Sequence, residues 1–71
     1  MHELSITQSI LKISLEAASQ QGATRIRAIR LRMGPFSGVV PECVQMYLDV
    51  LAKGTRAEGA KIEVETVPLK V

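Results

Sequence analysis

The chain has 71 residues, of which 46% are hydrophobic and 3% aromatic, and its formal net charge is +2. A chain of this length buries only about 60% of its unfolded surface, so we expect residues 1–71 to form one small domain with an aliphatic core. Acidic and basic residues are interspersed, and this mild charge does not demand a nucleic acid or a membrane as partner.

The same sequence lacks several targeting and stabilising features. Its longest apolar runs are far shorter than the roughly 18 residues that span a bilayer. The N-terminus has no basic segment followed by an apolar one, so it does not resemble a signal peptide. One cysteine, Cys43, cannot form a disulfide framework or a zinc site within one chain. We therefore expect a cytoplasmic protein.

The chain begins Met1-His2-Glu3, and His2 is its only histidine. The Met1 amine, the His2 backbone nitrogen and the His2 imidazole can close five- and six-membered chelate rings, a planar set that suits Cu(II) or Ni(II). The backbone nitrogen of Glu3 or a partner can supply a fourth donor, with the Glu3 carboxylate beside the ion. Most chains with histidine at position 2 carry no metal, so this start is a hypothesis that needs further support.

Apolar residues at helical spacing predict a first helix from Leu4 to about Gln21. Its apolar arc consists of two ridges, namely Leu4, Leu11, Leu15 and Ala18, and Ile6, Ile10, Ile13 and Ala17. Gly22 is expected to end this helix in a left-handed conformation. His2 and Glu3 then lie in or just before its first turn. The helix dipole favours the Glu3 carboxylate there but not a cation, so a metal needs amide deprotonation or the carboxylate to offset this penalty.

Residues 24–33 and 61–67 are predicted to be strands. The first strand alternates Ile29, Leu31 and Met33 on one face, with Ile26 and Ala28 on the other. It also carries four arginines, which suggest phosphate binding: Arg25, Arg27, Arg30 and Arg32. The second strand presents Glu63 and Glu65 on one face and Ile62 and Val64 on the other. Pairing of arginine with glutamate across a solvated face is the favoured explanation, because no aromatic residues are interleaved to stack bases.

A turn-rich loop over 34–38 precedes a second predicted helix, which starts at Pro41 and is closed by Lys53 and Gly54. Its apolar stripe consists of Val44, Tyr47, Leu48 and Leu51, flanked by Met46 and Val50. Cys43 lies in its first turn, and no second histidine exists to activate it. We therefore expect a packed or bystander cysteine, and a protein that is not an enzyme.

The predicted class is α+β with α-β-α-β order. A strand–helix–strand unit of this length normally joins parallel strands, and both helices should cover the one apolar face of the sheet. Two strands are too few for a stable sheet. We therefore expect a free edge to be completed by another chain, which makes a homo-oligomer, or by a strand outside this sequence.

Several residues together resemble the HypA/HybF family of nickel-insertion metallochaperones, which mature nickel–iron hydrogenase and, in some organisms, urease. The residues that carry this resemblance are Met1-His2-Glu3-Leu4-Ser5, Gly34, Ser37, Val39, Pro41-Glu42, Gly54-Thr55, Glu58-Gly59-Ala60, Glu65 and Pro68.

The resemblance implies a nickel site with His2 as main ligand through its imidazole, helped by backbone nitrogens of Met1, His2 or Glu3. It implies that the Glu3 carboxylate affects nickel delivery without being a required ligand. It also implies two partners, a nickel-handling maturation GTPase and the hydrogenase large subunit.

Family members continue beyond the position of Pro68 into a zinc-binding module with two Cys-x-x-Cys pairs. This chain has none of those cysteines, so no zinc is expected in it. It is therefore either a fragment that contains the nickel-binding domain or a natural short form.

Two other functions remain open at this stage. The first is a small interaction module that uses an exposed sheet edge, without a physiological metal. The second, less favoured, is an RNA-binding domain that uses the arginine strand.

Overall fold

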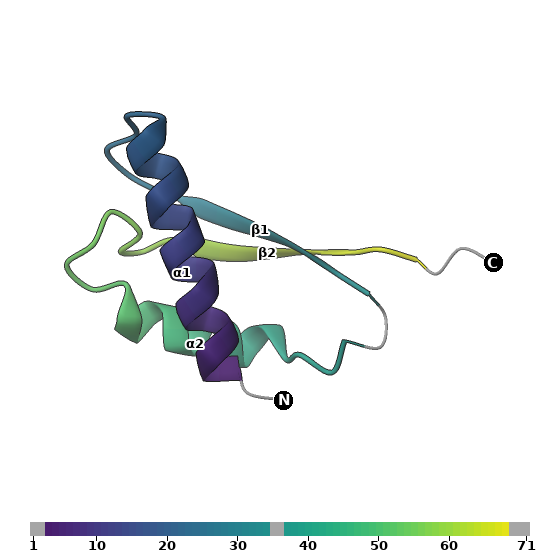
Figure 1. Cartoon of the computed structure of the whole chain (residues 1–71). Coiled ribbons are helices and arrows are strands. Elements are labelled where there is room, and N and C mark those ends of the chain that lie inside the picture. Colours follow the sequence, from purple (N-terminus) through teal and green to yellow (C-terminus); the bar gives the residue numbers. More distant parts are fainter. Residues whose placement is uncertain (1–2, 35–36, 69–71) are drawn as a thin grey trace.

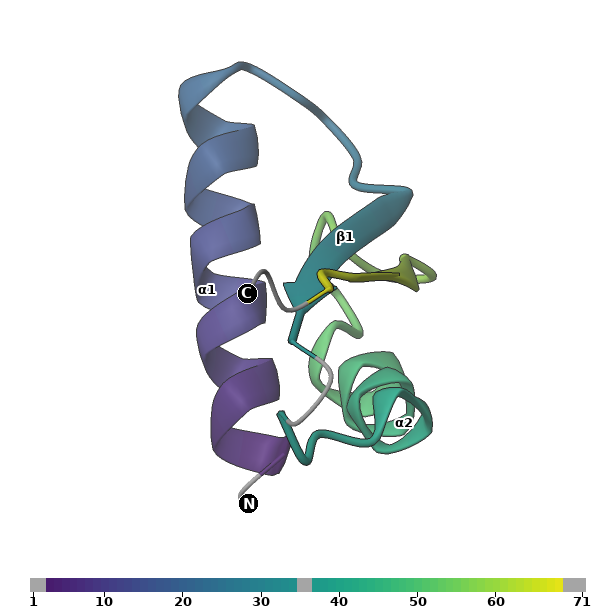
Figure 2. The same cartoon turned by 90° about the vertical axis from the view of Figure 1, so that its right-hand side faces the viewer.

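The computed structural model describes residues 3–34 and 37–68. They form α1 (Glu3–Gln20), β1 (Ala28–Met33), α2 (Pro41–Leu51) and β2 (Lys61–Thr66), in the predicted order. Helix α1 crosses in front of both strands in Figure 1, with α2 below them. The turned view in Figure 2 shows α1 on one side of the strands. No helix in these residues is long and apolar enough to cross a membrane.

The two strands form a parallel sheet, as predicted, in a register that pairs Ala28 with Lys61 and Met33 with Thr66. On its outer face Arg30 lies 3.5 Å from Glu63. Arg32 lies 3.9 Å from Glu65 in the same way. The predicted arginine–glutamate pairing is confirmed. Exposed pairs of this kind stabilise a fold by only about 0–1 kcal/mol each, so their main consequence is to mark this face as the solvated one.

The first strand is shorter than predicted, because β1 begins at Ala28 rather than at residue 24. The chain facing residues 24–27 is the turn-rich segment before β2, which offers no strand for a ladder. The Ile26 N–H donates to the Arg56 carbonyl of this segment at 2.8 Å, and the Arg27 carbonyl accepts from the Lys61 N–H at 3.0 Å. Ile26, predicted on the solvated face, packs against the core instead.

The helix ends follow the predicted signals with one difference. Gly22 has a φ of +71°, the Gly22 N–H donates to the Ser19 carbonyl, and the Ala23 N–H donates to the Ala18 carbonyl. This is the Schellman pattern that closes a helix. Helix α2 starts at Pro41 as predicted but ends at Leu51, so its last turn contains no basic residue.

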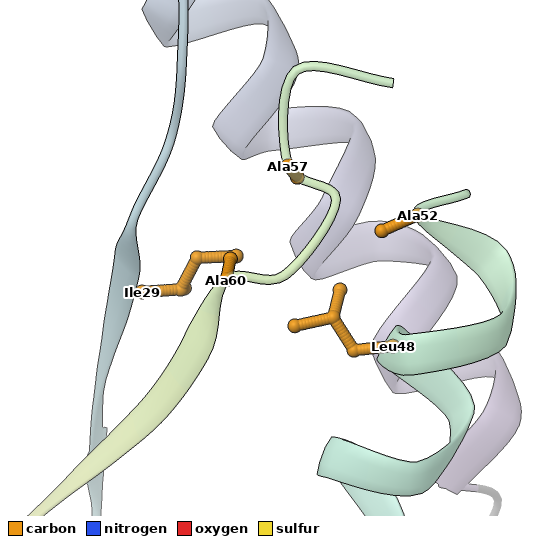
Figure 3. Packing of buried hydrophobic residues seen from close by; sticks show 5 residues of the cluster. All are labelled: Ile29, Leu48, Ala52, Ala57 and Ala60. Carbon is orange, nitrogen blue, oxygen red and sulfur yellow. The ribbon is translucent and has the colours of Figure 1, made fainter. Parts of the chain in front are cut away.

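The buried core joins all four elements. Its central cluster, drawn in Figure 3, consists of Ile29, Leu48, Ala52, Ala57 and Ala60. Partly buried residues pack around it: Ile10, Leu11, Leu15, Ile26, Leu31 and Ile62. Both helices thus contribute to a core on the sheet face opposite the ion pairs. Three of the five central residues are alanines, which lets the loop before β2 approach α2 closely.

The buried side of α1 differs from the predicted arc. Thr7 is completely buried and Ala18 is 5% exposed, whereas Ile13 is 66% exposed. The prediction that Ile13 faces the core is therefore wrong. The two most buried positions of α1 are thus held by small side chains, while a large one faces solvent.

Gln45 ties α2 to β2 through its side-chain amide. Its Oε1 accepts from the Ile62 N–H at 2.7 Å, and its Nε2 donates to the Ala60 carbonyl at 3.1 Å. The Nε2 also donates to Asp49 Oδ1 at 2.8 Å. The amide therefore occupies backbone groups at the start of β2 that a further strand would otherwise bind.

Candidate metal centre

The predicted metal site is at the start of α1. Met1 and His2 lie outside the described residues, so the structure places neither the amine nor the imidazole. Glu3 is described, and it is the first residue of α1 and half-buried. Of the three predicted site residues, the structure therefore locates only Glu3.

The position of Glu3 suits a backbone nitrogen ligand. The first four N–H groups of an α-helix have no acceptor within the helix. A metal that replaces the Glu3 amide proton would therefore break no hydrogen bond of the helix. The Glu3 carboxylate, in the first turn, adds a negative charge that offsets the unfavourable meeting of a cation with the positive end of the dipole.

Thr7 connects the first turn of α1 to the buried interior of the domain. Its side chain is fully buried, and its Oγ1 donates to the Glu3 carbonyl at 2.6 Å. No role was predicted for Thr7 from the sequence. A hydroxyl four residues after Glu3 was the available signal, because threonine in a helix often donates to the carbonyl four residues before it. Thr7 thus fixes where α1 presents Glu3.

No other metal centre is found in residues 3–34 and 37–68, which contain no group of three His, Cys, Asp or Glu side chains able to hold an ion. Cys43 is a half-buried free thiol in the first turn of α2.

Comparison with known proteins gives these observations a context. The family model described as "Hydrogenase/urease nickel incorporation, metallochaperone, hypA" matches residues 1–71. The hydrogenase maturation factor HypA of Roseiflexus sp. (strain RS-1) is 48% identical over 71 residues, which are 100% of this chain and 58% of that protein. The HypA of Methanopyrus kandleri is 49% identical over 65 residues, 92% of this chain and 46% of that protein. The HypA of Syntrophus aciditrophicus is 41% identical over 71 residues, 100% of this chain and 62% of that protein.

These matches define a metallochaperone rather than an enzyme. The chain belongs to the HypA family of hydrogenase and urease nickel-incorporation proteins, which confirms the resemblance found in the sequence. It spans about half to three fifths of the length of these curated relatives.

Proposed function

We propose that residues 1–71 act as one nickel-binding domain that carries Ni(II) as cargo and delivers it during hydrogenase maturation. The His2 imidazole is the essential side-chain ligand, and backbone nitrogens of Met1, His2 and Glu3 complete the donor set. The observation that carries this proposal is the family match over the whole chain, which includes the Met1-His2-Glu3 start. The free backbone position of Glu3 at the start of α1 supports it.

This donor set also suits release. A carrier must give up its ion, and terminal ligands can be exchanged one at a time. The helix does not need the Glu3 N–H for its own hydrogen bonds, so the nitrogen can be protonated again without loss of structure. The Glu3 carboxylate then acts beside the ion, where it assists transfer to a partner.

The deciding experiment is a nickel titration of the untagged protein, with mass analysis of the intact N-terminus. We expect one ion per chain, and no binding by the His2→Ala variant. Cys43→Ala is the matched control, because it removes the one thiol of the chain and should leave affinity unchanged. Retained affinity in His2→Ala would refute the assignment of His2, whereas no nickel binding by the original protein would favour an interaction module without a metal.

A one-residue extension before Met1 tests the amine separately. It moves the free amine away from the chelate while all side chains stay in place. We expect a large loss of affinity. If the extended protein binds nickel as well as the original, the amine is not a ligand.

Nickel binding should also weaken from about pH 8 to about pH 6. Terminal amines and imidazoles have reference pKa values of about 7.7–8.0 and about 6.5, and both must lose a proton to bind a metal. Protons therefore compete with the ion more strongly as the pH falls. Calorimetric titration across this range provides the measurement, and a flat profile would contradict the ligand set.

The proposed partners are a nickel-handling maturation GTPase and the hydrogenase large subunit, which follow from the HypA family. We also propose that another chain, a second copy in the first instance, completes the sheet through an edge. The two-stranded sheet supports this, since three or more strands are usually needed. Sedimentation over a range of concentrations, with and without nickel, tests it: a strict monomer throughout would exclude self-association.

A further inference from the structure

The two loops that flank the start of the sheet carry a surface of arginines. We define the basic loop surface as Arg25, Arg27 and Arg56. All three residues are exposed. Two backbone bonds hold their segments together: the Ile26 N–H donates to the Arg56 carbonyl at 2.8 Å, and the Lys61 N–H donates to the Arg27 carbonyl at 3.0 Å. The arginines are therefore presented at one place by two distant parts of the chain.

These arginines differ from those of the sheet in their surroundings. Arg30 and Arg32 each face a glutamate across the strands. In residues 3–34 and 37–68, no carboxylate lies within 4.0 Å of the three arginines of the basic loop surface. Glu58 lies beside these arginines, and its carboxylate accepts a hydrogen bond from the Gly54 N–H at 3.0 Å, so three guanidinium charges are set against one carboxylate. The positive charge of the basic loop surface is thus left for an external partner.

The surface is also hollowed. Arg25 borders three shallow open depressions of about 450, 260 and 290 Å³. Arg27 borders the first two, and Arg56 borders the third. None of the residues that line them is aromatic. The depressions are open and have no aromatic side chain on which a base could stack. Their guanidinium groups can instead bind carboxylates on the side chains of a flexible peptide.

We propose that the basic loop surface docks an acidic segment of a partner protein. Arginine pairs with a carboxylate through two parallel N–H···O bonds, so Asp and Glu side chains suit it well. A nucleic acid fits less well, because single strands are held by aromatic stacking as well as by charge. A small anion also fits less well, because the arginines are solvated and the hollows are open.

This surface is separate from the proposed nickel site. Figure 1 shows the turn after α1 at the upper left and the loop between α2 and β2 below it at the left, whereas the first turn of α1 is at the bottom. Helix α1 has 18 residues and is therefore about 27 Å long. A partner bound at the loops leaves Glu3 accessible, and nickel binding and docking can be measured independently.

The test is a fluorescence anisotropy titration of the whole chain with a labelled twelve-residue peptide of repeated Glu-Glu-Gly. The triple variant Arg25→Gln, Arg27→Gln, Arg56→Gln should bind the peptide about tenfold more weakly. The matched control Lys12→Gln, Arg32→Gln, Lys53→Gln removes the same charge at residues that border none of the three depressions, and it should bind within about threefold of the original. Both variants should bind nickel as the original does, and binding of the peptide should weaken with added salt.

Equal losses in both triple variants would show a general charge effect and overturn the proposal, as would no loss in either. Stronger binding to an oligouridylate of the same length, lost in the loop variant, would overturn it in favour of RNA. Circular dichroism checks that each variant is folded. If the loop variant does not fold, the single changes Arg25→Gln and Arg56→Gln take its place, with Arg32→Gln as their control. Unchanged affinity in both of these single variants would also overturn the proposal.

Discussion

The two helices are attached to this domain in different ways. Helix α2 has 11 residues and buries Val44 and Leu48 to 0% and 1% exposure, and its Gln45 bonds directly to the backbone of β2. Helix α1 has 18 residues, yet only Thr7 and Ala18 are buried. We therefore expect α2, although shorter, to contribute more to the stability of the fold than α1.

This difference suggests separate roles: α2 stabilises the fold, and α1 positions the proposed nickel site. Of the proposed nickel ligands the structure describes Glu3, and residues 3–6 at the start of α1 are exposed or only partly buried. Regions with few buried contacts open at low free energy, which suits a site that must exchange its ligands. Four substitutions test whether α2 carries the fold while α1 only positions its own first turn.

Leu48→Ala should have the largest effect. Leu48 is in the central cluster, and a Leu→Ala change in a core costs about 2–5 kcal/mol. The free energy of unfolding of a domain of this size is only a few kcal/mol, so this substitution should unfold both helices together. Circular dichroism during urea unfolding provides the measurement. If helicity were kept with an unchanged midpoint, α2 would not contribute more to stability than α1.

Gln45→Ala should come next, with a loss of about 1–3 kcal/mol, because the Ile62 N–H and the Ala60 carbonyl lose their partner. Asp49→Ala is the control, since it removes only the exposed contact of the same amide. Urea midpoints of the two variants should differ clearly. Equal midpoints would mean that water replaces the amide at β2 without cost.

Thr7→Val should cost about 1 kcal/mol, because it keeps the shape of the buried side chain but removes the bond to the Glu3 carbonyl. Ser9→Ala, which alters an exposed hydroxyl of the same helix, should have little effect. We expect faster hydrogen exchange in the first turn of α1 and little change in α2. Exchange that rises equally in both helices would contradict a local role.

Ile13→Gln should have the smallest effect, within about 0.5 kcal/mol, because this side chain is mostly exposed. Leu11→Gln, on the side that packs against the core, should be clearly more destabilising. Thermal unfolding of the pair measures the contrast. A large loss for Ile13→Gln would show that this face of α1 is covered in solution.

The sequence by itself determined the local structure of the chain. Periodicity predicted both helices, Gly22 and Pro41 marked an end and a start, and the alternation of Arg30 and Arg32 with Glu63 and Glu65 predicted the strand pair. These features depend on neighbours along the chain or on one repeating pattern, so they can be read without the fold. The Met1-His2-Glu3 start was likewise recognisable as chelating chemistry, and it stays a prediction.

Only the tertiary structure decided the features that depend on distant neighbours. β1 begins at Ala28 because its partner strand begins at Lys61. Ile13 is exposed while Thr7 is buried, because the crossing point of the two helices selects which face of α1 is covered. Arg25, Arg27 and Arg56 form one surface because backbone bonds bring two loops together. In each case the physical reason is the same: burial and pairing are set by what lies opposite in space.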